Sequence, residues 1–363
     1  MKSDFTNRSQ IRVLFCVLNW GLGHASRSIP VIHQLLSQGY FVDLASDGRA
    51  GRLLKSEFPD LEYFEMPGYK VSYPSENMQW NIASQSPKIL SAISAERSWV
   101  RQMHKVNPYD ILISDNRYGC RVPGIHNIMI THQISPLTGS QSTNWIASKI
   151  SRRVFDTYDE VWIPDDESLN LSGRLGQSQS LRHSRFIGLL SRSLESPSES
   201  KMRYKAMAIL SGPEPQRSIF ESWVREEWAE WTEPYLIVRG VTEGSDEIRK
   251  ISQNGYEVDF LSGSSWAEAV LSSDVIVGRA GYSSIMDYVT WKKKCILIPT
   301  PGQYEQEYLA EHIDYPGIHF RRHLDFDLIH TINRLDEVEM PDYVNEELSR
   351  CVRQLKENWR STE

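Results

Sequence analysis

Short apolar runs alternate with longer amphipathic segments along the whole chain. Apolar runs that predict buried strands cover 11–18, 40–46, 109–115, 127–133, 160–165, 186–188, 206–212, 235–240, 257–262, 274–281 and 295–302. Apolar residues at helical spacing predict helices over 24–39, 85–106, 143–154, 215–230 and 341–360. Because the strands of a parallel sheet are buried on both faces, this alternation predicts parallel sheets covered by helices.

A stretch rich in serine and charge, near 190–203, interrupts this pattern before it starts again. We therefore predict an α/β protein with two doubly wound, Rossmann-like domains facing across a cleft, although a long surface loop would also explain the stretch. The expected division is a domain at 1–190, a linker at 191–203, a second domain at 204–340 and a helical segment at 341–363 that packs back on the first domain. Ligands of such sheets bind at the carboxyl ends of the strands.

Composition and charge narrow the class of protein. Of the 363 residues, 40% are hydrophobic and 24% are charged, which is ordinary for a soluble globular chain. A net charge of -7 argues against nucleic acid as the main partner. The four cysteines lack metal-binding spacing and fit reduced, buried thiols. No stretch reaches the ~20 apolar residues of a membrane span, so a cytoplasmic protein is expected, with contact at the inner face of a membrane left open.

A glycine turn, Gly21-Leu22-Gly23, separates the first strand from the first helix. Such glycines let the backbone approach a ligand, and the helix N-terminus that follows favours an anion. The third glycine of a dinucleotide fingerprint is replaced by Ser26, so an NAD enzyme remains a weak alternative, as does a purely structural turn.

His24 follows this turn, in the first turn of the predicted helix. The helix dipole disfavours an imidazolium there, and a neutral imidazole is what a general base requires. Asp115 ends the strand at 109–115 and could orient the ring. The alternative is that His24 and Asp115 only cap a turn and a helix. His132 and Gln133 end the strand at 127–133 and are expected to face the same cleft, unless His132 only forms a strand-end hydrogen bond.

A second group of polar residues lies in the second predicted domain. Gly281 opens a helix whose first turn carries Ser283 and Ser284, with Asp287 further along at a spacing that could reach a ribose diol. Glu305 and Gln306 begin the helix after the next strand. An anion-binding turn, a diol-binding acid and a polar pair outline a site for a nucleotide-diphosphate sugar. Arg279 is the best placed cation for the phosphates, whereas Arg27 and Arg239 are expected at the surface.

Three segments resemble the GT-B glycosyltransferases, in particular the family 28 group. They are GLGH at 21–24, GRAGYSSIMD at 278–287 and PTPGQYEQEYLA at 299–310, and the resemblance spans most of the chain. For the nucleotide, the resemblance implies that Asp287 binds the ribose hydroxyls and that the backbone near Phe260, Leu261 and Ser262 recognises the base. For the diphosphate, it implies contacts with Gly281, Ser283 and Ser284 and a second phosphate-side turn at Ser211 and Gly212. Glu305 and Gln306 would hold hydroxyls of the sugar. The resemblance also supports a base at His24 paired with Asp115, which places Gly21 and Gly23 on the acceptor side.

The chain departs from the family pattern at two places. Pro213 and Pro215 stand where the family often has glycines, and proline has no N–H to offer a phosphate. The acid expected at the ribose is Asp287 instead of the usual glutamate, one methylene shorter. The two prolines put the contribution of the turn at 211–215 to phosphate binding in doubt.

The resemblance implies transfer of a sugar, with UDP as the expected nucleotide, to a hydroxyl acceptor with inversion, without a metal or a cofactor. The acceptor would be a carbohydrate, a lipid-linked or a small molecule. The aromatic segment at 62–80 is expected to be a loop beside the acceptor. A nucleotide-sugar hydrolase or epimerase on the same fold is the main alternative, and a non-catalytic binding protein is a further one.

Overall fold

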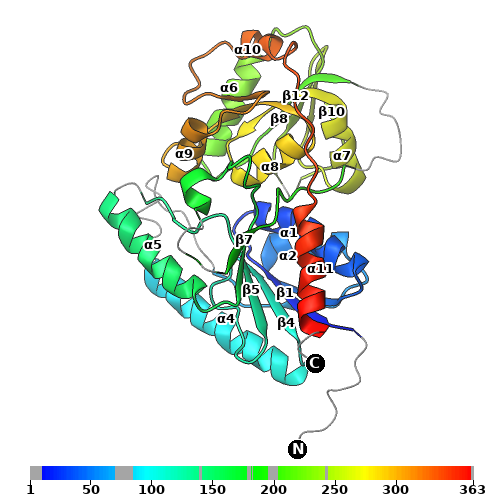
Figure 1. Cartoon of the computed structure of the whole chain (residues 1–363). Coiled ribbons are helices and arrows are strands. Elements are labelled where there is room, and N and C mark those ends of the chain that lie inside the picture. The colour runs from blue at the N-terminus through cyan, green and yellow to red at the C-terminus, as the bar shows by residue number, and fades with distance from the viewer. Residues whose placement is uncertain are drawn as a thin grey trace, which may run out of the picture. The chain divides into compact units, whose positions relative to one another are not determined.

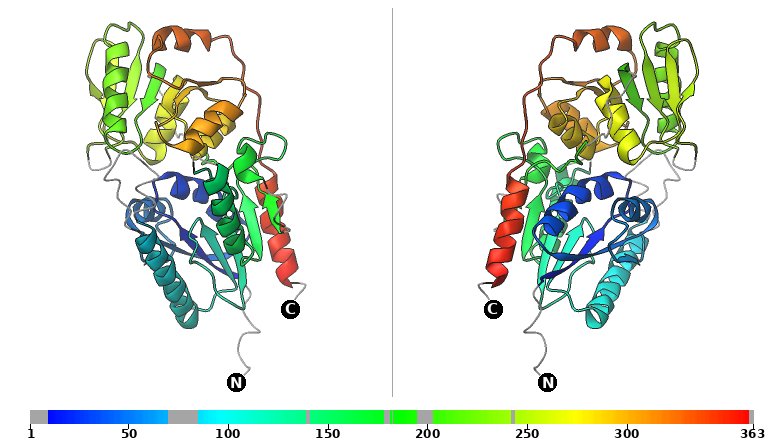
Figure 2. Two further views of the ribbon diagram at one scale, coloured as in Figure 1. Left: turned by 90° about the vertical axis from the view of Figure 1, so that its left-hand side faces the viewer. Right: turned by 90° about the vertical axis from the view of Figure 1, so that its right-hand side faces the viewer.

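The computed structural model describes residues 10–69, 85–138, 141–177, 181, 183–194, 203–241 and 244–360. The chain divides into two compact units (Figures 1 and 2). The first is Met1–Arg192 together with Asn345–Glu363, and the second is Ser193–Val344.

The described part of the first unit contains one parallel sheet in the order β3-β2-β1-β4-β5-β6-β7. Its strands are β1 (Arg12–Val17), β2 (Phe41–Ser46), β3 (Tyr63–Glu65), β4 (Ile111–Asp115), β5 (His126–Ile130), β6 (Glu160–Ile163) and β7 (Ser184–Phe186). The accompanying helices are α1 (Gly23–Ser37), α2 (Gly48–Glu57), α4 (Ser86–Val106), α5 (Gln141–Phe155), the 3₁₀ turn η1 (Gly173–Gly176) and α11 (Glu347–Arg360).

The order of this sheet reverses between β1 and β4, which pair in parallel with Val17 opposite Asp115. Helices α1 and α2 lie on one side of the sheet and α4 and α5 on the other, as Figure 1 shows. At such a switch point the connections leave in opposite directions, which opens space outside the carboxyl ends of the two strands. The turn before His24 and the residue Asp115 both lie at that point.

The second unit repeats the same plan in the residues that the structure describes. Its sheet has the order β10-β11-β9-β8-β12-β13-β14, parallel except where β10 pairs antiparallel with β11. The strands are β8 (Tyr204–Ile209), β9 (Tyr235–Val238), β10 (Arg249–Lys250), β11 (Gly255–Val258), β12 (Ser273–Arg279), β13 (Lys294–Ile298) and β14 (Ile318–Phe320). The helices are α6 (Gln216–Glu227), α7 (Gly263–Leu271), α8 (Tyr282–Thr290), α9 (Tyr304–His312) and α10 (Leu328–Arg334).

Here the order reverses between β8 and β12. The turns that follow these two strands contain Ser211 and Gly212 in one case and Gly281 in the other. The predicted phosphate turns therefore lie at the switch point of the second sheet. Two doubly wound, parallel α/β domains, as the sequence predicts, are confirmed.

Apolar side chains between sheet and helices form the core of each unit. In the second unit, Phe220 and Val224 of α6 and Ile332 of α10 pack against strand residues such as Val275 and Ile296. In the first unit, one cluster joins strand residues to α4 and another joins them to α5. The near-continuous burial of β1 and β4 explains the apolar runs at 13–17 and 111–113.

Helix α11 packs on the first unit, against α1. The Tyr40 hydroxyl donates to the Val352 carbonyl at 3.0 Å, and the Gln34 amide donates to the Ser349 hydroxyl at 3.2 Å. The Asn345 amide holds the carbonyls of Ile187 and Leu189 at 3.0 and 2.9 Å. The end of the chain thus returns to the first unit.

Several features differ from the sequence-based expectation, and α2, α10 and the edge strand β14 were not predicted. The segment 62–80 was expected to be a loop, yet Tyr63–Glu65 forms the edge strand β3, while 70–80 lie outside the described residues. The two-residue strand β10 was not expected, because Arg249 and Lys250 carry no apolar pattern. Helix α11 begins at Glu347 instead of 341, and most of the predicted linker, 195–202, lies outside the described residues.

A buried arginine fastens the strand ends of the first unit. Arg117, which is fully buried, donates through Nε to the Val17 carbonyl at 2.7 Å and through Nη1 to the Pro67 carbonyl at 2.9 Å. It also forms ion pairs with Glu96, at 3.0 Å, and with Asp47. Because Glu96 is itself fully buried, its carboxylate depends on this cation.

Replacing Arg117 by methionine should therefore lower the free energy of unfolding by about 3–5 kcal/mol, since a buried carboxylate loses its partner. Urea denaturation followed by circular dichroism measures this change. Arg52→Met, at an exposed position of α2, is the matched control and should shift the midpoint little. Equal midpoints for the two variants would contradict the role of Arg117.

Candidate functional site

The turn after β1 places His24 at the beginning of α1. Gly21 has a φ of +86°, in the region that favours glycine, and no atom lies within 4 Å of the position a Cβ would take. Gly23 is the first helical residue, and the His24 side chain keeps 15% of its surface exposed. The turn therefore places the partly accessible imidazole of His24 at the switch point of the first sheet.

His24 is hydrogen-bonded to Asp115. The distance from Nδ1 of His24 to Oδ1 of Asp115 is 2.7 Å, and the aspartate is fully buried at the end of β4. The Arg27 guanidinium binds both carboxylate oxygens, with Nε 2.8 Å from Oδ2, and the Ser28 hydroxyl donates to Oδ2 at 3.1 Å. Burial alone would raise the pKa of Asp115, but Arg27 and His24 outweigh it and hold that pKa below its usual range.

His24 is neutral near pH 7. Burial lowers its pKa, and the charge of Arg27 lowers it further, against the opposite effect of Asp115, so that the net value lies below the ordinary 6.5. The ionised Asp115 can only accept a hydrogen bond, so Nδ1 of His24 carries the proton. Its Nε2 then holds a lone pair, as a general base requires.

His132 joins the same network through Arg27. Its Nδ1 lies 3.0 Å from Nη1 of Arg27, and the side chain is buried directly after β5. Gln133 is the next residue, half-buried, and its backbone N–H donates to the Thr131 hydroxyl at 3.1 Å. The structure thus brings His24, Asp115 and His132 together, as expected, but through an arginine that was placed at the surface from the sequence.

That expectation for Arg27 is wrong, because the side chain is only 1% exposed. The spacing of His24 and Arg27 in the sequence could have indicated that Arg27 lies beside His24. Residues 24, 27 and 28 share one face of a helix, so an arginine three residues after a candidate base could have been read as its neighbour.

In the second unit, Gly281 is the N-cap of α8 and has extended backbone angles, with φ −75° and ψ 137°. Ser283 and Ser284 occupy the first turn, half-buried, and Asp287 lies one turn further along, also half-buried. The first turn carries no acidic residue. A helix N-terminus presents N–H groups that have no intrahelical partner and the positive end of the helix dipole, so the start of α8 can receive an anion.

The turn after β8 adds a second group at this switch point. Ser211 and Gly212 are exposed, and Gly212 has a φ of +107°. A Cβ at Gly212 would lie 3.9 Å from the hydroxyl oxygen of Thr300, which follows β13. Thr300 is only 2% exposed, and its hydroxyl has no hydrogen-bond partner among the described residues. Sequence reasoning missed Thr300, since one threonine beside two prolines carries no distinctive pattern.

Arg279 does not occupy the place expected of a phosphate ligand. Its side chain is 5% exposed, and it donates from Nη1 to the Pro299 carbonyl at 3.2 Å and from Nη2 to the Gln216 carbonyl at 2.8 Å. The guanidinium also lies 4.5 Å from the centre of the Phe220 ring, and burial lowers its pKa to about 10. Arg279 therefore braces the turns after β8 and β13, because both of its terminal nitrogens are committed to backbone carbonyls.

Glu305 and Gln306 are half-buried in the first turn of α9. The Gln306 carbonyl oxygen accepts from the Thr300 N–H at 2.8 Å, and its amide nitrogen donates to the Gln303 side chain at 2.5 Å. Gln306 thus shapes the loop that presents Thr300. A sugar hydroxyl would have to compete with these two bonds.

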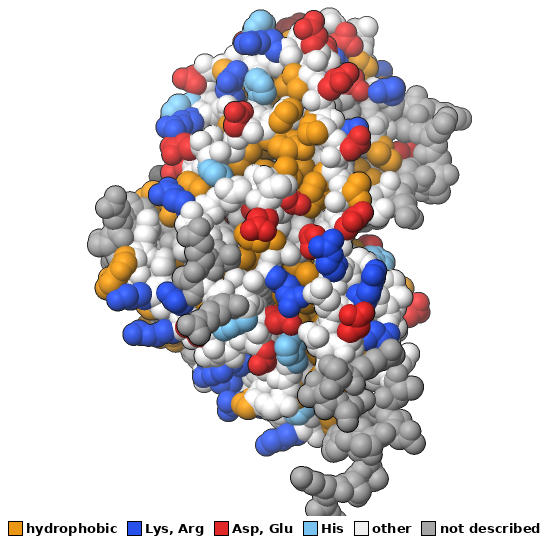
Figure 3. Space-filling view, in the orientation of Figure 1, with side chains coloured by type: hydrophobic (Ala, Val, Ile, Leu, Met, Phe, Trp, Pro, Cys, Tyr) orange, Lys and Arg blue, Asp and Glu red, His pale blue; other side chains and the backbone are white. Residues whose placement is uncertain are grey.

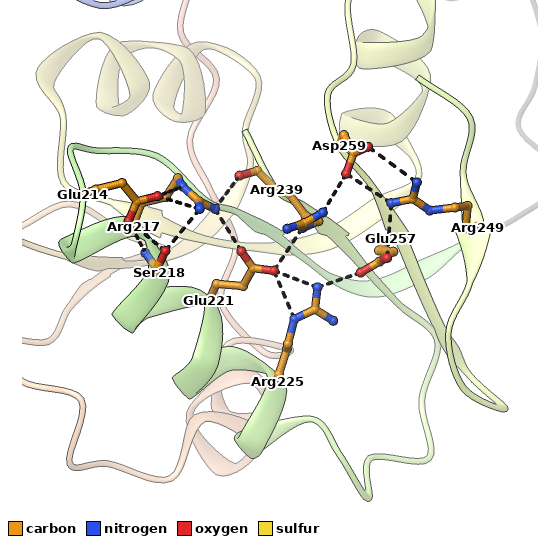
Figure 4. A network of polar contacts seen from close by, with 9 residues as sticks. All are labelled: Glu214, Arg217, Ser218, Glu221, Arg225, Arg239, Arg249, Glu257 and Asp259. Atoms are coloured by element: carbon orange, nitrogen blue, oxygen red, sulfur yellow. Dashed lines mark hydrogen bonds and ion pairs between the residues drawn. The ribbon is translucent and has the colours of Figure 1, made fainter. Parts of the chain in front are cut away.

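Phe260 and Leu261 are half-buried between β11 and α7. The preceding residue, Asp259, accepts from Nη1 of Arg239 at 2.8 Å and from the Ser245 N–H at 2.9 Å. Figure 4 shows how this pair continues into a network of charged side chains from α6 and the neighbouring strands. Its members are Glu214, Arg217, Ser218, Glu221, Arg225, Arg239, Arg249, Glu257 and Asp259.

Arg239 is central to that network, since its Nε also donates to Glu221 of α6 at 3.0 Å. It was expected at the surface, where 30% of its side chain is exposed, and it also pairs there with the carboxylates of Glu221 and Asp259. Four arginines face four carboxylates there, so the network is balanced in charge. The start of the segment at 260–262 is therefore held by ion pairs to α6.

No group of three or more His, Cys, Asp or Glu side chains that could hold a metal ion occurs in the part of the chain that the structure describes. Asp165 and Asp166 are adjacent acids after β6, and Asp165 has a structural role. Asp165 is buried and accepts from the Ser172 N–H and the Leu171 N–H, at 2.8 and 3.2 Å. Its carboxylate therefore shapes the loop after β6.

Comparison with solved structures identifies the fold. A UDP-glucosyltransferase from Polygonum tinctorium aligns over 98% of this chain and 100% of its own, with a TM-score of 0.63 at 12% identity. MurG of Acinetobacter baumannii aligns over 96% of this chain and 99% of its own, with a TM-score of 0.53 at 12% identity. The fold is the GT-B fold of glycosyltransferases.

Sequence comparison adds a similarity to one glycosyltransferase family. Residues 218–318 match the model of the glycosyltransferase family 28 C-terminal domain. The UDP-N-acetylglucosamine--N-acetylmuramyl-(pentapeptide) pyrophosphoryl-undecaprenol N-acetylglucosamine transferase of Staphylococcus aureus (strain MRSA252) is 21% identical over 290 residues, 77% of this chain and 76% of that protein. The chain has the GT-B fold and, over residues 218–318, a domain of the family 28 C-terminal type, which indicates an enzyme of the hexosyltransferase class. The predicted resemblance is confirmed.

Proposed function

We propose that this protein transfers a sugar from a nucleotide-diphosphate donor to a hydroxyl acceptor, with inversion at the anomeric carbon. The observation that carries the proposal is the 2.7 Å bond between a neutral His24 and the ionised Asp115. The names of similar proteins support a nucleotide sugar as donor, with UDP as the first choice. A spinosyn rhamnosyltransferase with the same fold forms a complex with thymidine diphosphate, so a dTDP-sugar is the second candidate donor.

His24 would act on the acceptor. Its Nε2 takes the proton of the acceptor hydroxyl while that oxygen attacks the anomeric carbon and the bond from this carbon to the diphosphate oxygen breaks. The nucleotide diphosphate leaves with the electron pair. Asp115 stabilises the imidazolium that forms and holds the ring in the required tautomer. Attack from the face opposite the diphosphate gives inversion.

The acceptor would bind beside the turn after β1. Gly21 and Gly23 allow it to approach the backbone of this turn, with His132 and Gln133 as further acceptor-side residues.

The second unit would bind the donor. The N-terminus of α8, with Gly281, Ser283 and Ser284, receives the diphosphate together with the turn at 211–212. The leaving group is then stabilised by N–H groups and hydroxyls, without a metal or a cofactor. Asp287 binds the ribose and Glu305 and Gln306 the sugar, while the segment at 260–262 faces the base. Arg279 acts here as a brace for the phosphate turns.

His24→Ala should reduce turnover by ~100-fold or more and leave donor affinity nearly unchanged, because a general base contributes to the chemical step. Steady-state kinetics with a UDP-sugar, together with calorimetry of UDP binding, measures both quantities. His33→Ala, on the same helix with 59% of its side chain exposed, is the control and should behave like the wild type. Normal turnover by His24→Ala would remove His24 from the base role. Release of free sugar without an acceptor would instead favour a hydrolase.

Asp287→Ala should weaken UDP binding by about 10- to 100-fold, the cost of losing hydrogen bonds to a charged group. Calorimetric titration with UDP, dTDP and GDP measures this loss and also ranks the three nucleotides. Asp325→Ala, an exposed residue before α10, should leave the affinity unchanged. Equal affinity in Asp287→Ala and the wild type would exclude the ribose contact.

We further propose that helix α5 brings the enzyme to an anionic lipid surface, as an enzyme with a lipid-linked acceptor requires. Trp145, Ile146 and Ile150 are 60%, 52% and 56% exposed. Lys149 lies between them, 3.6 Å from the centre of the Trp145 ring, and Arg153 is exposed one turn further on. The sequence 141–155 contains no acid. Apolar side chains interleaved with cations suit the interface of an anionic membrane.

Figure 3 shows apolar and basic side chains together at the left edge of the molecule, over α5. No helix in the described residues is long and apolar enough to cross a membrane. The proposed contact is therefore peripheral.

Trp145→Ser combined with Lys149→Glu should reduce sedimentation with vesicles of phosphatidylcholine and phosphatidylglycerol at least tenfold, since an apolar anchor and a cation are lost. Vesicles of phosphatidylcholine alone should bind the wild type weakly. Leu271→Ser, at an exposed apolar residue of the second unit, is the control. Equal sedimentation of the double variant and the wild type would contradict the proposed surface.

A further inference from the structure

Arg27 lies one helical turn after His24, and nothing in the proposed reaction assigns it a part. It is 1% exposed and is among the largest fully buried side chains of the described residues. Its guanidinium faces Asp115 with Nε and Nη2 and His132 with Nη1. A buried arginine is costly unless its charge and its donors are used. Here both are used, beside the proposed base.

The charge of Arg27 changes what Asp115 does to His24. A buried carboxylate next to a lone histidine would favour the imidazolium and raise the pKa of the ring. In this site Arg27 forms a bidentate ion pair with the same carboxylate, so the aspartate is already neutralised. The pKa of His24 is lowered by burial first and by Arg27 next, in spite of Asp115. The charged and titratable groups around the ring are Arg27 of α1, Asp115 of β4 and His132 after β5.

The donors of Arg27 also fix the second histidine. A guanidinium can only donate, so Nδ1 of His132, 3.0 Å from Nη1, must accept and be unprotonated. A neutral His132 then carries its proton on Nε2. His24 has the opposite tautomer, because Asp115 accepts from its Nδ1. One arginine and one aspartate thus give the two histidines complementary Nε2 atoms, an acceptor on His24 and a donor on His132.

We propose that Arg27 is a positioning residue that holds the Asp115 carboxylate beside Nδ1 of His24 and sets the tautomer of His132, so that Nε2 of His24 is a proton acceptor while Nε2 of His132 carries a proton. This inference rests on the proposed function in one respect, the role of His24 as the base. The arrangement suits an acceptor hydroxyl whose proton is taken by Nε2 of His24. The same cation makes the resulting imidazolium acidic enough to release its proton to solvent before the next turnover.

The test replaces Arg27 by methionine, which fills similar space without charge, and by lysine, which keeps the charge but loses the planar fork. Long-range ¹H–¹⁵N NMR of protein with ¹⁵N-labelled histidine reports the tautomer and the titration midpoint of each ring. Resonances are assigned with His24→Gln and His132→Gln. His33, exposed on the same helix, serves as an internal reference.

In the wild type we expect the Nδ1–H form for His24 and the Nε2–H form for His132. In Arg27→Met the titration midpoint of His24 should rise by at least about one pH unit, a tenfold gain in proton affinity. The acid limb of the profile of kcat/KM against pH should move upward by the same amount, because a larger share of His24 is protonated at each pH. In Arg27→Lys the midpoint should stay low, while His132 loses its single tautomer.

Unchanged midpoints and tautomers in a folded Arg27→Met protein would overturn the inference and leave Arg27 a structural residue. If that variant does not fold, the His132 tautomer in Arg27→Lys decides, and an unchanged tautomer would overturn it equally. Failure of the proposed function is a separate outcome. Normal turnover by His24→Gln would refute the base, while the NMR titration would still measure the effect of Arg27 on both rings.

Discussion

Parallel pairing of β1 with β4, and of β8 with β12, is the constraint on which both candidate sites depend. In each sheet these two strands are neighbours in space but lie far apart in the sequence, and the strand order reverses between them. Backbone hydrogen bonding fixes their register, so the residues that follow their carboxyl ends are brought to one place. His24 and Asp115 meet in this way in the first unit. The turns at 211–212 and at Gly281 both follow strands that meet in this way in the second.

Buried arginines then hold the residues at these strand ends in fixed positions. Arg117 ties the ends of β1 and β2 to Glu96, and Arg279 ties the turns after β8 and β13 to each other. Arg27 does the same for Asp115 and His132. A planar guanidinium with five donors suits this use, because it satisfies several acceptors in one plane and stays charged when buried. A lysine at these positions would satisfy fewer of them.

Much of the fold follows from local pattern. Apolar runs long enough to cross a sheet predict the central strands, and glycine turns predict where the helices begin. The strands that were missed are short and lie at the sheet edges. Strand β3 has three residues and β10 has two, so neither is long enough to show an alternation, and both exist because a neighbouring strand offers unpaired backbone groups. The later start of α11 likewise depends on the segment before it, where Asn345 holds the carbonyls of 187 and 189.

By itself, the sequence determined two doubly wound domains, the glycine turns and the identity of the polar residues at the strand ends, because all of these depend on residues close together in the chain. It also predicted that Asp115 could orient His24, since the carboxyl ends of the strands of one parallel sheet meet at the same edge. Only the tertiary structure decided which arginines are buried and what they hold. Arg27 and Asp115 are 88 positions apart, and Arg279 and Gln216 are 63 apart. The pairing of such residues depends on distances within the folded sheet, so the protonation of the proposed base is a property of the fold.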